Sequence, residues 1–461
     1  MLFSSVPFLF YFLPAVLLVY FLVPKRAKNG VLLLSSLVFY GWGEPRYLPV
    51  MLVSILQGYI FGRLIERFRD TRRAKLFLVL SVLLSLGTLA YFKYADFMIA
   101  NLNALTGLSA PLLRLALPVG ISFYTFQILS YTVDVYRGTV PAQRNFIDLA
   151  AYIAMFPQLI AGPIVRYSDI AVQLKTREHS VSEAASGARR FILGLAKKIL
   201  LANLLGELVS SFRASADLSV LYYWLGAIAF TLQIYYDFSG YSDMAIGLGR
   251  IFGFRFPENF RYPYLSGSIT EFWRRWHISL GSWFRDYLYI PLGGNRKGSA
   301  RQLLNILLVW LATGLWHGAA WNFVLWGLLF AALLLAEKWI PVLQRLPGVL
   351  RHGYVLLAVV LSFVLFNADS LAQAGQDFAG LFGFGSLSLT SAETLYYLKS
   401  YAVLFVLGIL GSTPVVKNAA RRMDGTKAGA VLEAAAMLAL LIVCTAYLVD
   451  GSFSPFLYFR F

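Results

Sequence analysis

The strongest candidate for chemistry is His317, one of four histidines in the chain. It lies in the segment VWLATGLWHGAAWNFVLWG, near the end of a strongly apolar run. An ionisable side chain at membrane depth is costly and is a functional candidate by default. Burial favours neutral imidazole, the form that a general base needs. The alternative is a core histidine bonded to a neighbouring helix, and the nearby Gly314 and Gly318 would let either a substrate or a helix approach closely.

The second candidate is His277, which follows the pair Arg274 and Arg275. Apolar residues between 269 and 280 recur at helical spacing, which predicts an amphipathic helix at the membrane surface. On that helix His277 would share the polar face with the two arginines, and by itself it is more typical of a polar face than of a catalyst. However, His277 and His317 could act together, one as a base and the other as a hydrogen-bond donor to a substrate carbonyl.

The remaining polar residues favour structural roles. Asp237 and Asp243 in YYDFSGYSDMA form no recognised metal-ligand set, and helix caps or interhelical hydrogen bonds explain them better. Cys444 is the single cysteine, so the chain contains neither an internal disulfide nor a cysteine-based metal site. A P-loop, a G-x-S-x-G motif and an H-E-x-x-H motif are all absent from the sequence. We therefore expect no metal.

The elements that position these residues are membrane helices. Of the 461 residues 59% are apolar, and the 14% that are charged make up about half the usual share for a soluble domain. The segment MFPQLIAGPIVRYSD holds prolines and a glycine that would break a helix, either to line a cavity or simply to form a kink. We expect an all-α polytopic protein in which about ten to twelve helices cross the bilayer and others are re-entrant or interfacial. The candidate spans are 6–23, 30–44, 48–64, 76–93, 115–136, 147–165, 189–211, 218–236, 302–320, 322–340, 353–367, 394–413 and 430–449.

The charge distribution predicts the orientation. The chain carries 40 Lys and Arg against 23 Asp and Glu, a net charge of +17. Six of these basic residues lie in the 63–75 loop, whereas the 45–47 connection has only Arg46. By the positive-inside rule the 63–75 loop is cytoplasmic and the N-terminus is extracytoplasmic. Nucleic-acid binding is the weaker interpretation of this charge, because cytoplasmic basic loops also attract anionic substrates and anionic lipids.

Six motifs along the chain carry a joint signal. They are MLFSSVPFLFYFLP, LPVGISFYTFQILSYTVDVYRG, FPQLIAGPIVRY, YYDFSGYSDMAIGLGRIFGF, FWRRWHISLGSWFRDYLYIPLGGNR and TGLWHGAAWNFVLWG. Together they resemble the membrane-bound O-acyltransferase family, and more narrowly its bacterial branch, typified by the membrane subunit of alginate O-acetylation. The resemblance covers most of residues 1–330, and we expect a single membrane domain over 1–461 in which 331–461 supplies C-terminal transmembrane helices.

This resemblance implies a site and a reaction. The family's near-invariant histidine falls on His317, and a second position, histidine in the bacterial branch, falls on His277. The implied fold is a ring of helices around a central tunnel in the bacterial inner membrane. The implied donor is cytoplasmic acetyl-CoA, a substrate and not a bound cofactor, and the acceptor is an extracytoplasmic protein or a polysaccharide. The expected substrate-binding residues are Trp273, Arg274, Arg275, Trp276, Trp316 and Asn322. The four tryptophans Trp273, Trp276, Trp316 and Trp321 either line the passage or, as the simpler interpretation, only pack as aromatic residues of the core.

The expected mechanism is direct transfer. His317 would deprotonate the acceptor hydroxyl, which attacks the thioester, while His277 would orient or polarise the donor. The nearest rival within the family is transfer of D-alanine from a carrier protein to a cell-wall polymer. A transporter in which His317 relays protons, and a scaffold without catalysis, are rivals from other classes. The sequence does not name the modified glycan.

Overall fold

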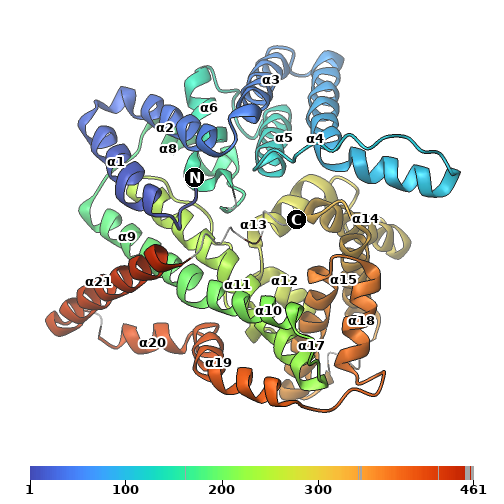
Figure 1. Cartoon of the computed structure of the whole chain (residues 1–461). Helices are drawn as coiled ribbons and strands as arrows, with labels where there is room; N and C mark the ends of the chain where they lie inside the picture. The colour runs from blue at the N-terminus through green and yellow to red at the C-terminus, as the bar shows by residue number, and fades with distance from the viewer. Residues whose placement is uncertain (161, 341, 343–344, 424, 452–456, 458–461) are drawn as a thin grey trace. The chain divides into compact units, whose positions relative to one another are not determined.

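The computed structural model describes residues 1–160, 162–340, 342, 345–423, 425–451 and 457 (Figure 1). Within this part of the chain every regular element is a helix. This observation confirms the all-α class, which is one of the two architectures that satisfy every backbone polar group inside a bilayer. The described residues fall into two compact units, and a single membrane domain over 1–461 stays a prediction.

The first unit comprises Met1–Phe191 and Ser242–Pro257. A long helix, α4, follows the basic loop of this unit and ends at Thr106. The next residue, Gly107, caps the helix in the left-handed conformation that glycine tolerates. The helices are α1 (Leu13–Leu22), α2 (Lys28–Gly43), α3 (Leu48–Arg67), α4 (Arg72–Thr106), α5 (Ile121–Arg137), α6 (Phe146–Ala154), α7 (Phe156–Leu159), α8 (Tyr167–Lys175) and most of α9 (Val181–Ala196).

The second unit comprises Ile192–Tyr241 and Glu258–Phe461 and contains both candidate histidines. Its core is an aromatic and aliphatic cluster built from α10, α11, α12, α14, α15, α17 and α19. The helices are α10 (Leu204–Ala214), most of α11 (Val220–Ile251), α12 (Ile269–Arg275), α13 (Ile278–Phe284), α14 (Ser299–His317), α15 (Trp321–Trp339), α17 (Gly348–Asn367), α18 (Leu371–Leu381), α19 (Ala392–Gly411), α20 (Val415–Arg421) and α21 (Lys427–Asp450).

Six helices among the described residues are long and apolar enough to cross a membrane. They are α3 with its preceding turn, α4, α15, α17, α19 and α21. The remaining expected spans overlap helical segments that are shorter or less apolar. The overlap is partial for 115–136, where the helix starts only at Ile121, and for 147–165. A polytopic membrane protein is therefore confirmed, and the count of ten to twelve spans and the central tunnel stay predictions.

Helices α14 and α15 form a close antiparallel pair joined by a turn of three residues. A Cβ atom on Gly314 would lie 2.3 Å from the carbonyl oxygen of Phe323, and one on Gly327 would lie 2.3 Å from that of Trp310. Only glycine permits this separation of the two backbones. The small residue before His317 thus serves helix packing, which is one of the two roles that the sequence left open.

Two expected helices are interrupted. The 147–165 segment is broken between α6 and α7 and again after Leu159, as its prolines and glycine predict. The continuous amphipathic helix expected over 269–280 is wrong, because α12 ends at Arg275 and α13 starts at Ile278. In addition, α11 continues to Ile251, so the polar stretch after residue 236 begins inside a helix.

Candidate active site

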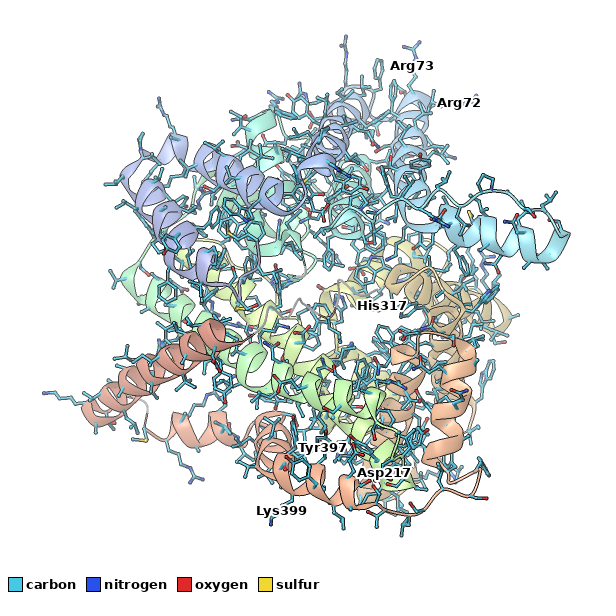
Figure 2. The ribbon with its side chains drawn as sticks, viewed as in Figure 1. Arg72, Arg73, Asp217, His317, Tyr397 and Lys399 are labelled. Carbon is cyan, nitrogen blue, oxygen red and sulfur yellow. The ribbon has the colours of Figure 1, made fainter. Side chains whose placement is uncertain are left out.

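His317 is the last residue of α14 and is 8% exposed. Gly318 leaves the helix in an extended conformation, and a Cβ atom on it would lie 2.2 Å from the Phe323 ring. The imidazole contacts two aromatic rings from other helices, Trp326 of α15 at 5.1 Å and Phe366 of α17 at 5.3 Å between centroids. Figure 2 labels His317 at the end of α14. The ring is therefore held by three packed helices.

Asn322 fixes the helices that surround His317. Its side-chain amide is buried, and Nδ2 donates a hydrogen bond of 2.9 Å to the carbonyl oxygen of Ala368. This bond ties the first turn of α15 to the chain just after α17. The structure thus places Asn322 where it supports the walls of the site, and its role in substrate binding stays a prediction. Trp321, its neighbour, is exposed.

His277 occupies the break between α12 and α13. Its φ of 44° and ψ of 52° lie in the left-handed region, which a histidine adopts rarely and at a cost of about 1–3 kcal/mol. Backbone hydrogen bonds on both sides hold this conformation, from Ile278 N to Asn259 O and from Arg261 N to Arg275 O. The side chain is 1% exposed, so the expectation that it lies on a polar helix face is wrong.

Asn259 determines which ring nitrogen of His277 carries the hydrogen. The Oδ1 atom of Asn259 accepts hydrogen bonds from the backbone N–H and the hydroxyl of Ser279, which fixes this atom as the carbonyl oxygen. His277 Nδ1 lies 3.2 Å from the same oxygen, so Nδ1 carries the hydrogen and donates it. His277 Nε2 is buried and has no hydrogen-bond partner among the described residues. The ring thus presents a free lone pair to the interior.

Burial also sets the charge of His277. Desolvation lowers the pKa of this imidazole to about 3, because the interior disfavours the charged form. The ring is consequently neutral at physiological pH. A neutral ring that already donates from Nδ1 can accept a hydrogen bond at Nε2 but cannot donate one there.

The structure connects the two histidines through Trp316. The His277 ring lies 5.7 Å from the Trp316 ring, which in turn lies 5.0 Å from the His317 ring. Phe238 of α11 closes the other side of His277 with an edge-on contact at 4.6 Å. Three of the expected site residues therefore form one continuous buried group.

The other two expected tryptophans occupy different places. Trp273 contacts Trp326 at 5.7 Å, so only one ring separates it from His317. Its Nε1 is buried and lacks a hydrogen-bond partner within the described ranges. Trp276 instead packs into the aromatic core against Phe272 at 5.5 Å and Phe363 at 5.3 Å. The structure thus places Trp273 next to the site and Trp276 in the core.

The two arginines lie at the outer end of α12. Arg274 is exposed, and Arg275 Nη2 is paired with Glu271 Oε1 at 2.6 Å. The opposite end of α12 is fixed by Glu337 of α15, whose carboxylate accepts hydrogen bonds from the backbone N–H groups of Ile269 and Thr270. The helix is therefore anchored at its start and presents its cations at its end.

The carboxylates form ion pairs. Asp237 Oδ1 lies 2.5 Å from Lys198 Nζ in the interior of the second unit. In the first unit, Asp243 Oδ1 lies 2.8 Å from Arg190 Nη2. Both pairs join different helices, as the interhelical interpretation expected. Across the described residues, no cluster of three histidine, cysteine or acidic side chains is arranged to hold a metal ion.

Three site residues were not identified from the sequence. Two of them lie in segments with visible signals: Trp326 is the second tryptophan of WNFVLWG, and Asn259 is the asparagine of FPENF. Phe366 lies 49 positions after His317 in an ordinary apolar run, and nothing in the sequence pointed to it. Only the packing of α17 against α15 brings it to the imidazole.

Comparison with known proteins now identifies the family. Residues 137–372 match the family described as MBOAT, membrane-bound O-acyltransferase family. The chain is 41% identical, over all of both chains, to a protein of Azotobacter vinelandii named probable alginate O-acetylase. It is 32% identical to the peptidoglycan O-acetyltransferase of Helicobacter pylori, over all of this chain and 98% of that protein. It is 27% identical to the teichoic acid D-alanyltransferase of Bacillus subtilis, over 53% of this chain and 65% of that protein. The chain therefore belongs to the membrane-bound O-acyltransferase family and is a multi-pass membrane O-acyltransferase.

Proposed function

We propose that this acyltransferase moves an acetyl group from cytoplasmic acetyl-CoA to an extracytoplasmic acceptor that serves O-acetylation of an alginate-like exopolysaccharide. The single observation that carries a hydroxyl-activating reaction is the buried group of His277, Trp316 and His317. The acetyl donor is supported by full-length relatives named for O-acetylation, whereas the relative named for D-alanyl transfer matches about half of the chain.

In this proposal His317 is the general base. Its position at the end of α14, between Trp326 and Phe366, limits water and fixes the ring. His317 takes the proton of the acceptor hydroxyl as the oxygen attacks the thioester carbonyl carbon. The carbon–sulfur bond then breaks, and the proton passes to the leaving thiolate of CoA. The products are the acetylated acceptor and the free thiol of CoA, and no acyl-enzyme forms.

His277 has an accepting role in the same proposal. Polarising the donor carbonyl would require a hydrogen on Nε2, but the bond to Asn259 uses the hydrogen on Nδ1 and burial opposes a second proton. We therefore assign to His277 Nε2 the acceptance of a hydrogen bond from a bound hydroxyl or water. This role replaces the donating role that the sequence suggested.

The substrates would enter from opposite sides. The basic loops predicted to be cytoplasmic would attract the phosphates of acetyl-CoA. The acceptor, an external partner protein or the polysaccharide itself, would approach from the other face of the bacterial inner membrane. Arg274, at the exposed end of α12, is the proposed contact of this site with the donor phosphates.

The decisive experiment measures acyl transfer by purified protein in proteoliposomes supplied with radiolabelled acetyl-CoA and candidate acceptors. We expect His317→Ala to lower the rate by about 10²–10⁴-fold, the range for loss of a general base. His352→Ala is the matched control, since this half-buried histidine lies outside the site and should retain the rate. A wild-type rate in His317→Ala would refute the mechanism.

The donor is tested in the same preparation. If acetyl-CoA gives no turnover in the wild type with acceptor and partner present, whereas a carrier protein loaded with D-alanine does, the D-alanyl function replaces the acetyl one. Acetyl transfer and D-alanyl transfer both need the base, so His317→Ala should abolish either reaction. The effect of His317→Ala therefore tests the mechanism, and the donor that gives turnover in the wild type tests the substrate.

Asn259 provides a finer test of the site. Asn259→Ala removes the oxygen that holds the hydrogen on Nδ1, so both neutral tautomers of His277 become populated. We expect a rate loss smaller than that of His277→Ala, with unchanged membrane insertion. A variant as active as the wild type would show that the tautomer of His277 does not matter.

A further inference from the structure

A group of basic side chains surrounds Tyr20 in the first unit, far along the sequence from the two catalytic candidates. The Tyr20 hydroxyl donates a hydrogen bond of 2.8 Å to Phe252 O. It accepts one from Arg177 Nε at 2.9 Å and one from His179 Nε2 at 3.0 Å. Tyr20 thus fixes two basic side chains of the loop after α8 at the end of α1.

Lys28, at the start of α2, completes this group. It is 9% exposed, and its Nζ lies 4.6 Å from the centroid of the Tyr20 ring and 5.1 Å from that of Phe21. Two cation–π contacts partly compensate the buried ammonium. No hydrogen-bond acceptor or carboxylate of the described residues contacts it. The three N–H groups of this ammonium therefore have no acceptor among the described residues.

Arg177 also has unused donors. Its guanidinium stacks on the Phe254 ring at 4.5 Å, which fixes the plane of the group. The Nε atom is bonded to Tyr20, and Nη1 lies 3.3 Å from Gln173 O. Nη2 has no acceptor within the described part of the chain. A planar, oriented guanidinium with free donors suits a phosphate oxygen.

The electrostatics of Lys28 and His179 favour an anion beside them. Burial lowers the pKa of the Lys28 ammonium, and the neighbouring charges of Arg177 and Lys25 lower it further. Burial likewise lowers the pKa of His179, followed by the charges of Lys28 and Arg177. The charged groups that act on these two residues are all cations. Gathering like charges costs free energy unless an anion lies among them.

The surroundings identify the source of that anion. On α1, next to the cations, Leu18, Phe21 and Leu22 are exposed apolar side chains. A soluble phosphate compound has no acyl chains that could cover this apolar surface. A phospholipid can place its acyl chains on the surface and its headgroup among the cations. The location at the 25–28 turn, on the side predicted to be cytoplasmic, agrees with the leaflet in which positive loops meet anionic lipid.

We propose that Lys25, Lys28, Arg177 and His179 form a binding site for the phosphate headgroup of an anionic phospholipid, with its acyl chains along α1. This site does not depend on the proposed acetyl transfer. The lipid would neutralise the cations and thereby stabilise the junction of α1, α2 and the loop after α8.

The experiment titrates the purified full-length protein in detergent with short-chain phosphatidylglycerol or phosphatidylcholine and counts bound lipid by native mass spectrometry. We expect the wild type to bind phosphatidylglycerol in preference to phosphatidylcholine. Arg177→Gln and Lys28→Met should each weaken phosphatidylglycerol binding at least about fivefold, the loss expected for one cation near a lipid phosphate. Arg72→Gln is the matched control, since Arg72 is an exposed cation at the start of α4 in the same unit (Figure 2).

Three outcomes would overturn the proposal. The first is equal phosphatidylglycerol binding by the wild type and Arg177→Gln, a variant that keeps Lys28 in place in case Lys28→Met does not fold. The second is equal weakening by Arg72→Gln, which would mean general attraction to positive charge. The third is displacement of the lipid by inorganic phosphate or CoA at equal concentration, which would assign the site to a soluble phosphate.

Discussion

At the scale of single residues, His277 combines a strained backbone conformation with a buried ring. The left-handed conformation turns the chain between α12 and α13, and the imidazole contacts Phe238 and Trp316 in the interior. Local strain persists where surrounding bonds determine it, and here the backbone bonds of Asn259 and Arg261 do so. The combination of strain, burial and a free Nε2 lone pair is typical of a functional residue.

Substitutions at His277 should separate strain from chemistry. Asparagine tolerates the left-handed region better than alanine, so His277→Asn should unfold at a temperature closer to the wild type than His277→Ala does. Both variants should lose acyl transfer, because neither supplies an imidazole nitrogen. Thermal unfolding in detergent and the transfer assay measure the two effects. Equal activity in wild type and His277→Asn would remove the imidazole from the reaction.

The pH dependence of stability tests the burial of the same ring. The pKa of His277 is lowered to about 3 in the folded protein, against about 6.5 in an unfolded chain. As the pH falls below 6.5 the unfolded state binds a proton that the folded state excludes, so stability decreases toward low pH. Between pH 7 and pH 5 the wild type should lose roughly 2 kcal/mol more free energy of unfolding than His277→Asn. Unfolding titrations at the two pH values would contradict this if both proteins changed equally.

At the scale of elements, the site depends on how closely α14 approaches α15. The Gly314–Gly327 crossing brings Trp326 to the His317 ring, and the Asn322 bond then holds the end of α17 beside both. The spacing of Gly314 and Gly318 around His317 was visible in the sequence, but it did not distinguish a substrate from a helix as the neighbour. That choice depended on Gly327, whose partner lies 13 positions away.

Substitution of glycine by alanine should lower stability where the added Cβ meets the neighbouring backbone and raise stability where the Cβ meets nothing. Gly314→Ala and Gly327→Ala each place a Cβ about 2.3 Å from a backbone oxygen, so we expect lower thermal stability and weaker activity. Gly353→Ala in α17 is the matched control, since its Cβ would meet nothing within 4 Å. That substitution should stabilise the helix by about 0.5–1 kcal/mol. A stabilising effect of Gly327→Ala would contradict the close crossing.

At the scale of the whole molecule, apolar periodicity predicted the helices and could not predict the site. The segments 353–367 and 394–413 coincide with α17 and α19 because long apolar runs in a bilayer have one dominant conformation. The same reasoning failed over 269–280, since tertiary bonds from Asn259 override helical periodicity at His277. His317 became a candidate because its ionisable side chain lies in an apolar run. Its ring neighbours Trp326 and Phe366 required the folded structure.

The predicted orientation is tested on one helix. Helix α3 with its preceding turn, Pro45–Arg67, is long and apolar enough to cross the membrane, and exposed residues flank it at Arg46 and Arg72. Because Cys444 is the single cysteine and is buried, Cys444→Ser gives a background for introducing Arg46→Cys or Arg72→Cys. In intact cells an impermeant maleimide that passes the outer layers should label Arg46→Cys, whereas Arg72→Cys should need a permeabilised membrane.

The alternative labelling patterns are equally informative. The reverse pattern would mean that the protein has the opposite orientation in the membrane. The proposed phospholipid site would then lie in the outer leaflet, where the cytoplasmic surface potential does not act. Labelling of both positions from one side would mean that α3 does not cross. The expected pattern would place the 63–75 loop and the turn after α1 on the same side, because α2 and α3 then cross in opposite directions. The basic residues of both loops would thus share the cytoplasmic face with the donor proposed for the reaction.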